Sequence, residues 1–110
     1  MSDEPNRRRH ARVPVEVALE LVIDGAPVVV ARVVDASPGG ALVEVASPPP
    51  LSATGRAVLR RGDASVERHA RVVRIRWGGR DRGERVKPAV ALVFDDADQD
   101  AAARLEALLR

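Results

Sequence analysis

Apolar residues alternate with polar ones along several segments of this chain, and this period of two restricts the fold more than any other feature. From Val13 to Ile23 every odd position is apolar, and Pro14, Glu16 and Glu20 stand between them. The alternation returns from Val66 to Trp77. Successive side chains of a β-strand point to opposite faces of a sheet, so both segments are predicted to be strands with one buried face.

Four further strands are predicted between turn signals, because short runs of β-branched and apolar residues favour an extended chain. These runs cover 28–34, 40–46, 55–61 and 86–94. The Asp24-Gly25 pair is typical of a hairpin, and the prolines at 48–50 predict a stiff connection. Another turn is expected at Gly62-Asp63, and a glycine-rich, charged loop over residues 78–85.

The end of the chain has the spacing of a helix. One apolar stripe at this spacing comprises Ala101, Leu105, Leu108 and Leu109. Asp96 is followed three residues later by Gln99, which is the pattern of a capping box at a helix start. We therefore predict an amphipathic helix over about 96–109.

The 110 residues, of which 45% are hydrophobic, fit one domain with a modest core. Trp77 and Phe94 are the only aromatic residues, so valine, alanine and leucine must fill the core, and Trp77 is expected in it or against the helix. We predict an all-β domain over residues 13–110, a small barrel or sandwich of about six antiparallel strands that ends in the helix. Residues 1–12 are polar and are predicted to be a flexible arm.

The sequence also limits the compartment and the chemistry. Cysteine is absent, which excludes disulfides and thiolate metal sites. We find no apolar run typical of a signal peptide or a membrane span, so a cytoplasmic protein is expected. His10 and His69 are too few and too isolated for a metal site or a catalytic pair.

Two arginines near the start of the chain, Arg8 and Arg12, stand in the pattern R-x-x-x-R. In an extended chain residues four apart lie on the same side, about 13 Å from each other. A guanidinium can hold a phosphate through two hydrogen bonds or grip the O6 and N7 edge of guanine. The pair, with Arg7 and Arg9 beside it, fits a ligand with phosphates and guanines, although a solvated basic tail has the same pattern.

Residues 35–40 have the pattern D-x-S-x-x-G. Pro38 before Gly39 favours a type II turn with Gly39 at positive φ, and Gly40 has no Cβ, so its backbone can approach a ligand closely. Asp35 can accept from two N–H groups of a guanine, and Ser37 can donate to a phosphate. The alternative is an ordinary β-turn in which both side chains satisfy local backbone donors.

An R-x-x-x-R ahead of the first strand, a hairpin, and a D-x-S-x-x-G at the end of the second strand together resemble the PilZ domain family. The later strands and the closing helix are similar as well, so the resemblance runs from about Arg7 onward. It implies a six-stranded antiparallel PilZ-like β-barrel that binds cyclic di-GMP, a bacterial second messenger. The ligand contacts expected from it are Arg7, Arg8, Arg12, Asp35, Ser37, Gly39 and Gly40.

The resemblance implies a single-domain bacterial receptor that needs no cofactor or metal beyond cyclic di-GMP itself. A ligand that bridges the arm and the barrel would order the arm, and so change the surface shown to an unidentified protein partner. This switch is the function that we expect from the sequence.

Two other functions remain open at this point. A nucleic-acid-binding barrel would explain the excess of arginine over residues 56–87, but single-strand binders use stacking aromatics, which are almost absent here. A ligand-free adaptor with a PilZ-like shape is the second alternative, and the intact motifs speak against it. An enzyme is not expected, because no acid–base or nucleophile set is present.

Overall fold

A computed structural model describes residues 16–81, 83–95 and 97–110 of the chain. The predicted arm, with Arg7, Arg8, His10 and Arg12, lies outside these residues and stays a prediction. The elements are β1 (Ala18–Ile23), β2 (Ala26–Val28), β3 (Val30–Ser37), β4 (Gly40–Val45), β5 (Thr54–Arg61), β6 (Ala64–Arg76), β7 (Gly79–Asp81), β8 (Glu84–Val86), β9 (Ala89–Phe94) and α1 (Gln99–Leu109).

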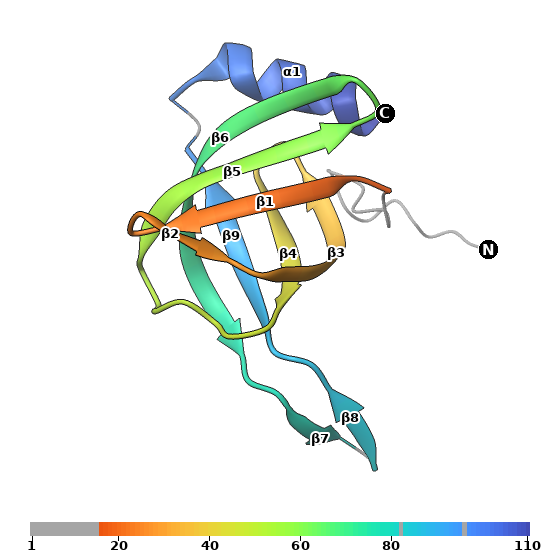
Figure 1. Ribbon diagram of the computed structural model, residues 1–110. Helices are drawn as coiled ribbons and strands as arrows, with labels where there is room; N and C mark the ends of the chain where they lie inside the picture. The colour runs from red at the N-terminus through yellow and green to blue at the C-terminus, as the bar shows by residue number, and fades with distance from the viewer. Residues whose placement is uncertain (1–15, 82, 96) are drawn as a thin grey trace, which may run out of the picture.

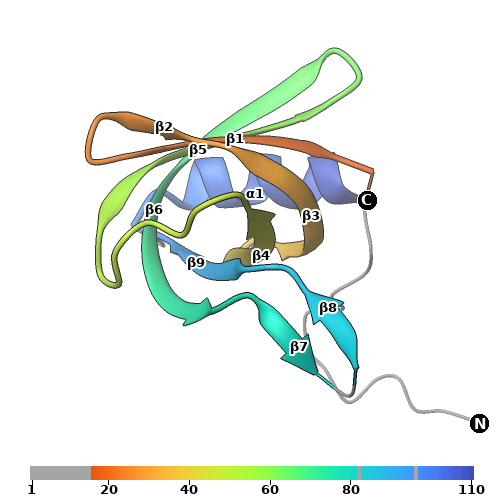
Figure 2. The same cartoon turned by 60° about the horizontal axis from the view of Figure 1, so that its bottom comes forward.

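Seven of the strands form one antiparallel sheet in the order β2-β1-β5-β6-β9-β4-β3. Its two end strands, β2 and β3, are consecutive in the chain and are separated only by Val29. The sheet therefore curls round until its ends meet (Figures 1 and 2). The predicted class, an antiparallel β fold with one C-terminal helix, is confirmed. This sheet has seven strands in an open order rather than the predicted six. The additional strand arises because residues 26–37 form two strands, of which β2 pairs with β1 and β3 pairs with β4.

The first hairpin forms where the sequence predicts it. Ile23 of β1 pairs with Ala26 of β2, and the two residues between them, Asp24 and Gly25, have φ angles of 52° and 79°. Two consecutive residues in the left-handed region are what a tight hairpin turn of the right twist needs, and Asp-Gly supplies them at low cost. This turn fixes the register of β1 and β2.

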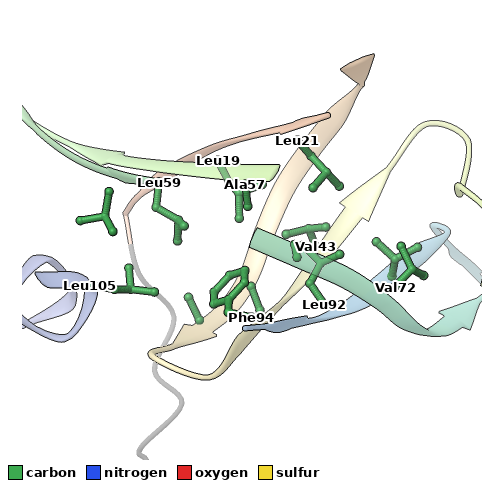
Figure 3. Close-up of a cluster of buried hydrophobic side chains, with 14 of the residues drawn as sticks. Leu19, Leu21, Val43, Ala57, Leu59, Val72, Leu92, Phe94 and Leu105 are labelled. Atoms are coloured by element: carbon green, nitrogen blue, oxygen red, sulfur yellow. The ribbon is translucent and has the colours of Figure 1, made fainter. Parts of the chain in front are cut away.

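The core lies inside the curled sheet and consists of the apolar side chains that alternate along each strand and point inward. Leu21, Leu59, Val72 and Leu92 are almost completely buried there, and side chains from β1 and β5 face those from β4, β6 and β9 across it (Figure 3). Leu105 of α1 completes the same cluster, so the helix covers one end of the sheet (Figure 1). Leucine, valine and alanine make up most of this core, as the composition predicts, and Ile23 and Phe94 complete it.

The prediction for Trp77 is wrong, because 67% of this residue is exposed. It follows Arg76, the last residue of β6 that pairs with β9, so it stands beyond the end of the seven-stranded sheet. Beyond it the predicted loop contains a short two-stranded ribbon of β7 and β8, which projects from the end of the molecule away from α1 (Figure 1). Trp77 thus belongs to the base of a projection and not to the barrel interior.

The helix begins three residues later than predicted. Asp98 is its N-cap, and the Asp98 carboxylate accepts a hydrogen bond of 2.9 Å from the backbone N–H of Ala101. Before it, the Asp95 carboxylate accepts from the N–H of Ala97 at 2.8 Å, so the chain is still turning there. The predicted cap residue, Asp96, lies outside the described residues.

Candidate ligand-binding site

The residues of the D-x-S-x-x-G motif end β3 and begin β4. Asp35 pairs with Leu42 across the two strands, and Ser37 pairs with Gly40. Ala36, between them, is 2% exposed and belongs to the core. Because neighbours in a strand point to opposite faces, Asp35 and Ser37 lie on the side of the sheet away from the core, which we call the outer face.

Ser37 and Gly40 are also linked directly. The Ser37 hydroxyl donates a long hydrogen bond of 3.5 Å to the Gly40 carbonyl oxygen, and Ser37 is itself buried. The structure thus brings together four of the predicted site residues: Asp35, Ser37, Gly39 and Gly40. The three predicted arginines fall outside the described residues, so their approach to this corner remains a prediction.

The turn at Pro38-Gly39 differs from the prediction, because Gly39 does not have a positive φ. Type I and type II turns differ by a flip of their central peptide, whose carbonyl here belongs to Pro38. That carbonyl accepts a 2.8 Å hydrogen bond from the Arg68 guanidinium, and the Gly39 carbonyl accepts one of 2.9 Å from the N–H of Phe94. These two contacts hold the turn in its observed form.

Gly40 is required by the sheet itself. A Cβ at this position would collide with the Leu92 carbonyl on β9, the strand with which β4 pairs. Glycine therefore lets β4 and β9 approach at this point, and it leaves the outer face without a side chain there. Gly40 is itself buried, so packing against β9 accounts for this glycine, and the expected close approach of its backbone to a ligand stays a prediction.

Arg68 is the site residue that the sequence analysis missed. It lies on the inward parity of β6, is 2% exposed, and its guanidinium carbon is 5.2 Å from the centre of the Phe94 ring. The guanidinium donates to the Pro38 carbonyl and, at 2.6 Å, to the Asp95 carbonyl. It thereby ties the motif turn to the start of the helical segment. Its burial could have been predicted, because Arg68 alternates in step with the apolar residues Val66, Ala70 and Val72.

Farther along the outer face, Glu44 of β4 forms the centre of an ion cluster. The Arg32 guanidinium donates to both of its carboxylate oxygens, at 3.3 and 3.1 Å, and Arg76 lies 3.5 Å away. The hydrogen bonds from Arg32 lower the pKa of Glu44 below its ordinary value of 4.5, with smaller help from the charges of Arg32, Lys87 and Arg76 against the effect of burial. The Glu44 carboxylate is therefore charged near neutral pH and clamps β3 to β6.

The described residues hold no group of three histidine, aspartate or glutamate side chains that is placed to bind a metal ion. Their single helix is too short and too polar to cross a bilayer. His69 is exposed on the outer parity of β6, as predicted for a histidine on a strand face.

Comparison with known proteins identifies the family. A model of the PilZ domain matches residues 6–110, which is nearly the whole sequence, and the chain therefore belongs to the PilZ domain family. The fold is similar to that of the PilZ domain of YcgR from Escherichia coli, solved with c-di-GMP, at a TM-score of 0.64 and 15% identity over 94% of this chain and 89% of that one.

A second solved structure supports the same fold. An uncharacterised Legionella protein, Lpg0364, has a TM-score of 0.56 and 18% identity over 89% of this chain and 88% of that one. A search of curated proteins finds no significant match. The two structural likenesses show a PilZ-like antiparallel sheet with a C-terminal helix.

Proposed function

We propose that this chain is a cyclic di-GMP receptor that changes conformation on binding and signals through contact with a protein partner. The observation that carries the proposal is the placement of Asp35 and Ser37 side by side on the outer face, with Gly40 opposite Ser37 on the next strand. A carboxylate can accept from the two N–H groups of a guanine edge, and a hydroxyl can donate to a phosphate. The membership in the PilZ family, and the c-di-GMP in the YcgR structure, support this choice of ligand.

The arm supplies the second half of the proposed site. Arg8 and Arg12 match the family pattern R-x-x-x-R, and each would add a charge-assisted contact to phosphate or guanine. A ligand held by both the arm and the outer face would fix one relative to the other. This is how we propose that binding changes the surface that a partner meets.

Calorimetry with cyclic di-GMP, cyclic GMP and GTP tests the ligand assignment. We expect heat of binding with cyclic di-GMP and far weaker binding of the other two nucleotides. In Arg12→Ala the lost contact should weaken binding by about 1.5–3 kcal/mol. An affinity for cyclic di-GMP that is unchanged in Arg12→Ala would contradict the proposed role of the arm.

Hydrogen exchange tests the conformational change. Amide protons of residues 5–12 should exchange more slowly at saturating cyclic di-GMP than without it, because ordered backbone opens less often. Equal exchange in both states would refute the switch and leave the receptor assignment in place.

The charge distribution does not favour the nucleic-acid-binding alternative. Five arginines of residues 56–87 already have protein partners. Arg68 donates to the Pro38 carbonyl, Arg61 donates to the Leu108 carbonyl at the end of α1, and Arg60 pairs with Glu20 at 3.2 Å. Arg56 and Arg76 pair with Glu67 and Glu44. Few arginines of this range are therefore available to bind the phosphate backbone of a nucleic acid. Salt-sensitive binding to random DNA, with no response to cyclic di-GMP, would reverse this preference.

A further inference from the structure

Side chains of β6 stand on the outer face opposite the D-x-S-x-x-G residues. Ser37 pairs with Gly40, Gly40 pairs with Val93, and Val93 pairs with Arg71. Directly paired residues share a face of the sheet, so these four residues form one row across β3, β4, β9 and β6. Ser37 and Arg71 stand at its two ends.

A parallel row runs beside the first. Asp35 pairs with Leu42, Leu42 pairs with Ala91, and Ala91 pairs with Arg74. The register shifts between Val72 and Arg74, and this bulge keeps Arg74 on the outer face, in step with Arg71. Three strand spacings separate β3 from β6, a span of roughly 14 Å. The two rows thus have Asp35 and Ser37 on one side and two arginines on the other.

In the next row on the same face, the arginines form ion pairs within the protein. There Glu44 stands between Arg32 and Arg76 and binds both. Arg71 and Arg74 have no such partner: both are exposed, and within the described residues their side chains make no hydrogen bond or ion pair. Two adjacent unpaired arginines on this face are free to take an anion.

The floor between the two sides is small and apolar. It consists of Gly40, Leu42, Ala91 and Val93. Two hollows lie on the arginine side of this surface. One, of about 450 Å³, is lined by Arg71 and Val93. The other, of about 360 Å³, is lined by Arg74, Leu42 and Ala91. The first hollow also contains Asp95, whose carboxylate accepts from the N–H of Ala97. Flat purine rings can lie on such a floor while charged groups reach its edges.

We infer that Arg71 and Arg74 form a second side of the nucleotide site and bind a phosphate that Asp35 and Ser37 do not reach. The inference rests on the proposed function and adds to it a pair of contacts from β6. Arginine suits this role, because its planar fork binds phosphate through two parallel hydrogen bonds. A ligand with two phosphates and two bases has the length to lie across the rows from β3 to β6.

The test uses the full chain with two double variants of equal charge. Arg71→Gln with Arg74→Gln removes the proposed contacts, and Arg56→Gln with Arg60→Gln removes two exposed arginines of β5 that pair with Glu67 and Glu20. Cyclic di-GMP binding is measured by calorimetry at two or more salt concentrations. Circular dichroism confirms that all three proteins are folded.

We expect the Arg71/Arg74 variant to bind cyclic di-GMP at least about tenfold more weakly than the wild type, as loss of charge-assisted contacts to phosphate implies. Its affinity should also depend less on salt, while the Arg56/Arg60 variant behaves like the wild type. Equal affinity in the Arg71/Arg74 variant, or an equal loss in both variants, would overturn the inference. Absence of binding by the wild type would instead overturn the proposed function, and the inference with it.

Discussion

At the scale of single residues, Arg68 links the motif turn to the rest of the fold. It donates to the carbonyls of Pro38 and Asp95 from a buried position. In Arg68→Met both carbonyls lose a charged donor, and we expect the free energy of unfolding to fall by about 3 kcal/mol. Urea unfolding measures this change.

The matched control for this prediction is Arg56→Met. Arg56 is exposed and lies 3.9 Å from Glu67, and an exposed ion pair of this kind contributes only about 0.5 kcal/mol. If the two variants lose the same stability, Arg68 does not hold the turn as described.

Glu44 gives the protein a stability that depends on pH. Because hydrogen bonds from Arg32 lower the pKa of Glu44 in the folded state, the unfolded chain takes up the proton first as the pH falls. The stabilisation is complete above the ordinary pKa of 4.5 and is lost as the pH drops through the lower folded pKa. Urea midpoints between neutral pH and pH about 3 should therefore fall more steeply in the wild type than in Glu44→Gln. An equal dependence of the urea midpoint on pH in both proteins would contradict the stabilising role of the Glu44–Arg32 ion pair.

At the scale of elements, α1 depends on the sheet that it covers. An isolated helix of this length is unstable in water, and Leu105 is completely buried in the shared core. We expect Leu105→Ala to lower the free energy of unfolding by about 2–5 kcal/mol in a single cooperative transition. Leu109→Ala, at a half-buried position of the same helix, should cost less, as denaturant unfolding followed by circular dichroism can show. A separate early transition of the helix would contradict this dependence.

The sequence predicts the strands well where their pattern is local. Alternation between two faces locates β1 and most of β6, and short apolar runs between turn signals locate β4 and β5. Asp24-Gly25 identifies the first hairpin. Each of these signals depends only on neighbours in the chain. The division of one predicted strand into β2 and β3 at Val29 has another cause, because β2 pairs with β1 and β3 pairs with β4. No local pattern records which partner a segment will find.

The candidate site shows the same limit. The common position of Asp35, Ser37 and Gly40 where β3 meets β4 is predictable, because their spacing in the chain is the signal. Their contact with a ligand stays a prediction. The form of the Pro38-Gly39 turn depends on Arg68, which is 30 residues away in the sequence. The exposure of Trp77 likewise depends on where β9 stops pairing with β6. These contacts join distant segments, and only the assembled sheet reveals them.

At the scale of the whole molecule, the curled sheet places the apolar core on one face and the motif residues on the other. Its inner face and α1 hold the core, whereas its outer face presents the motif residues of β3 and β4 beside the strands that follow them in the sheet order. Residues that are distant in the chain thereby form one continuous surface. We propose that cyclic di-GMP binds to this surface.

Two-dimensional NMR of the isotope-labelled chain, titrated with cyclic di-GMP, tests this claim most directly. We predict that the largest chemical-shift changes among the described residues fall on the amides of residues 35–42 and 91–93, and that those of the β7–β8 ribbon stay almost unchanged. An unchanged spectrum at saturating nucleotide, or changes confined to the ribbon, would contradict the claim.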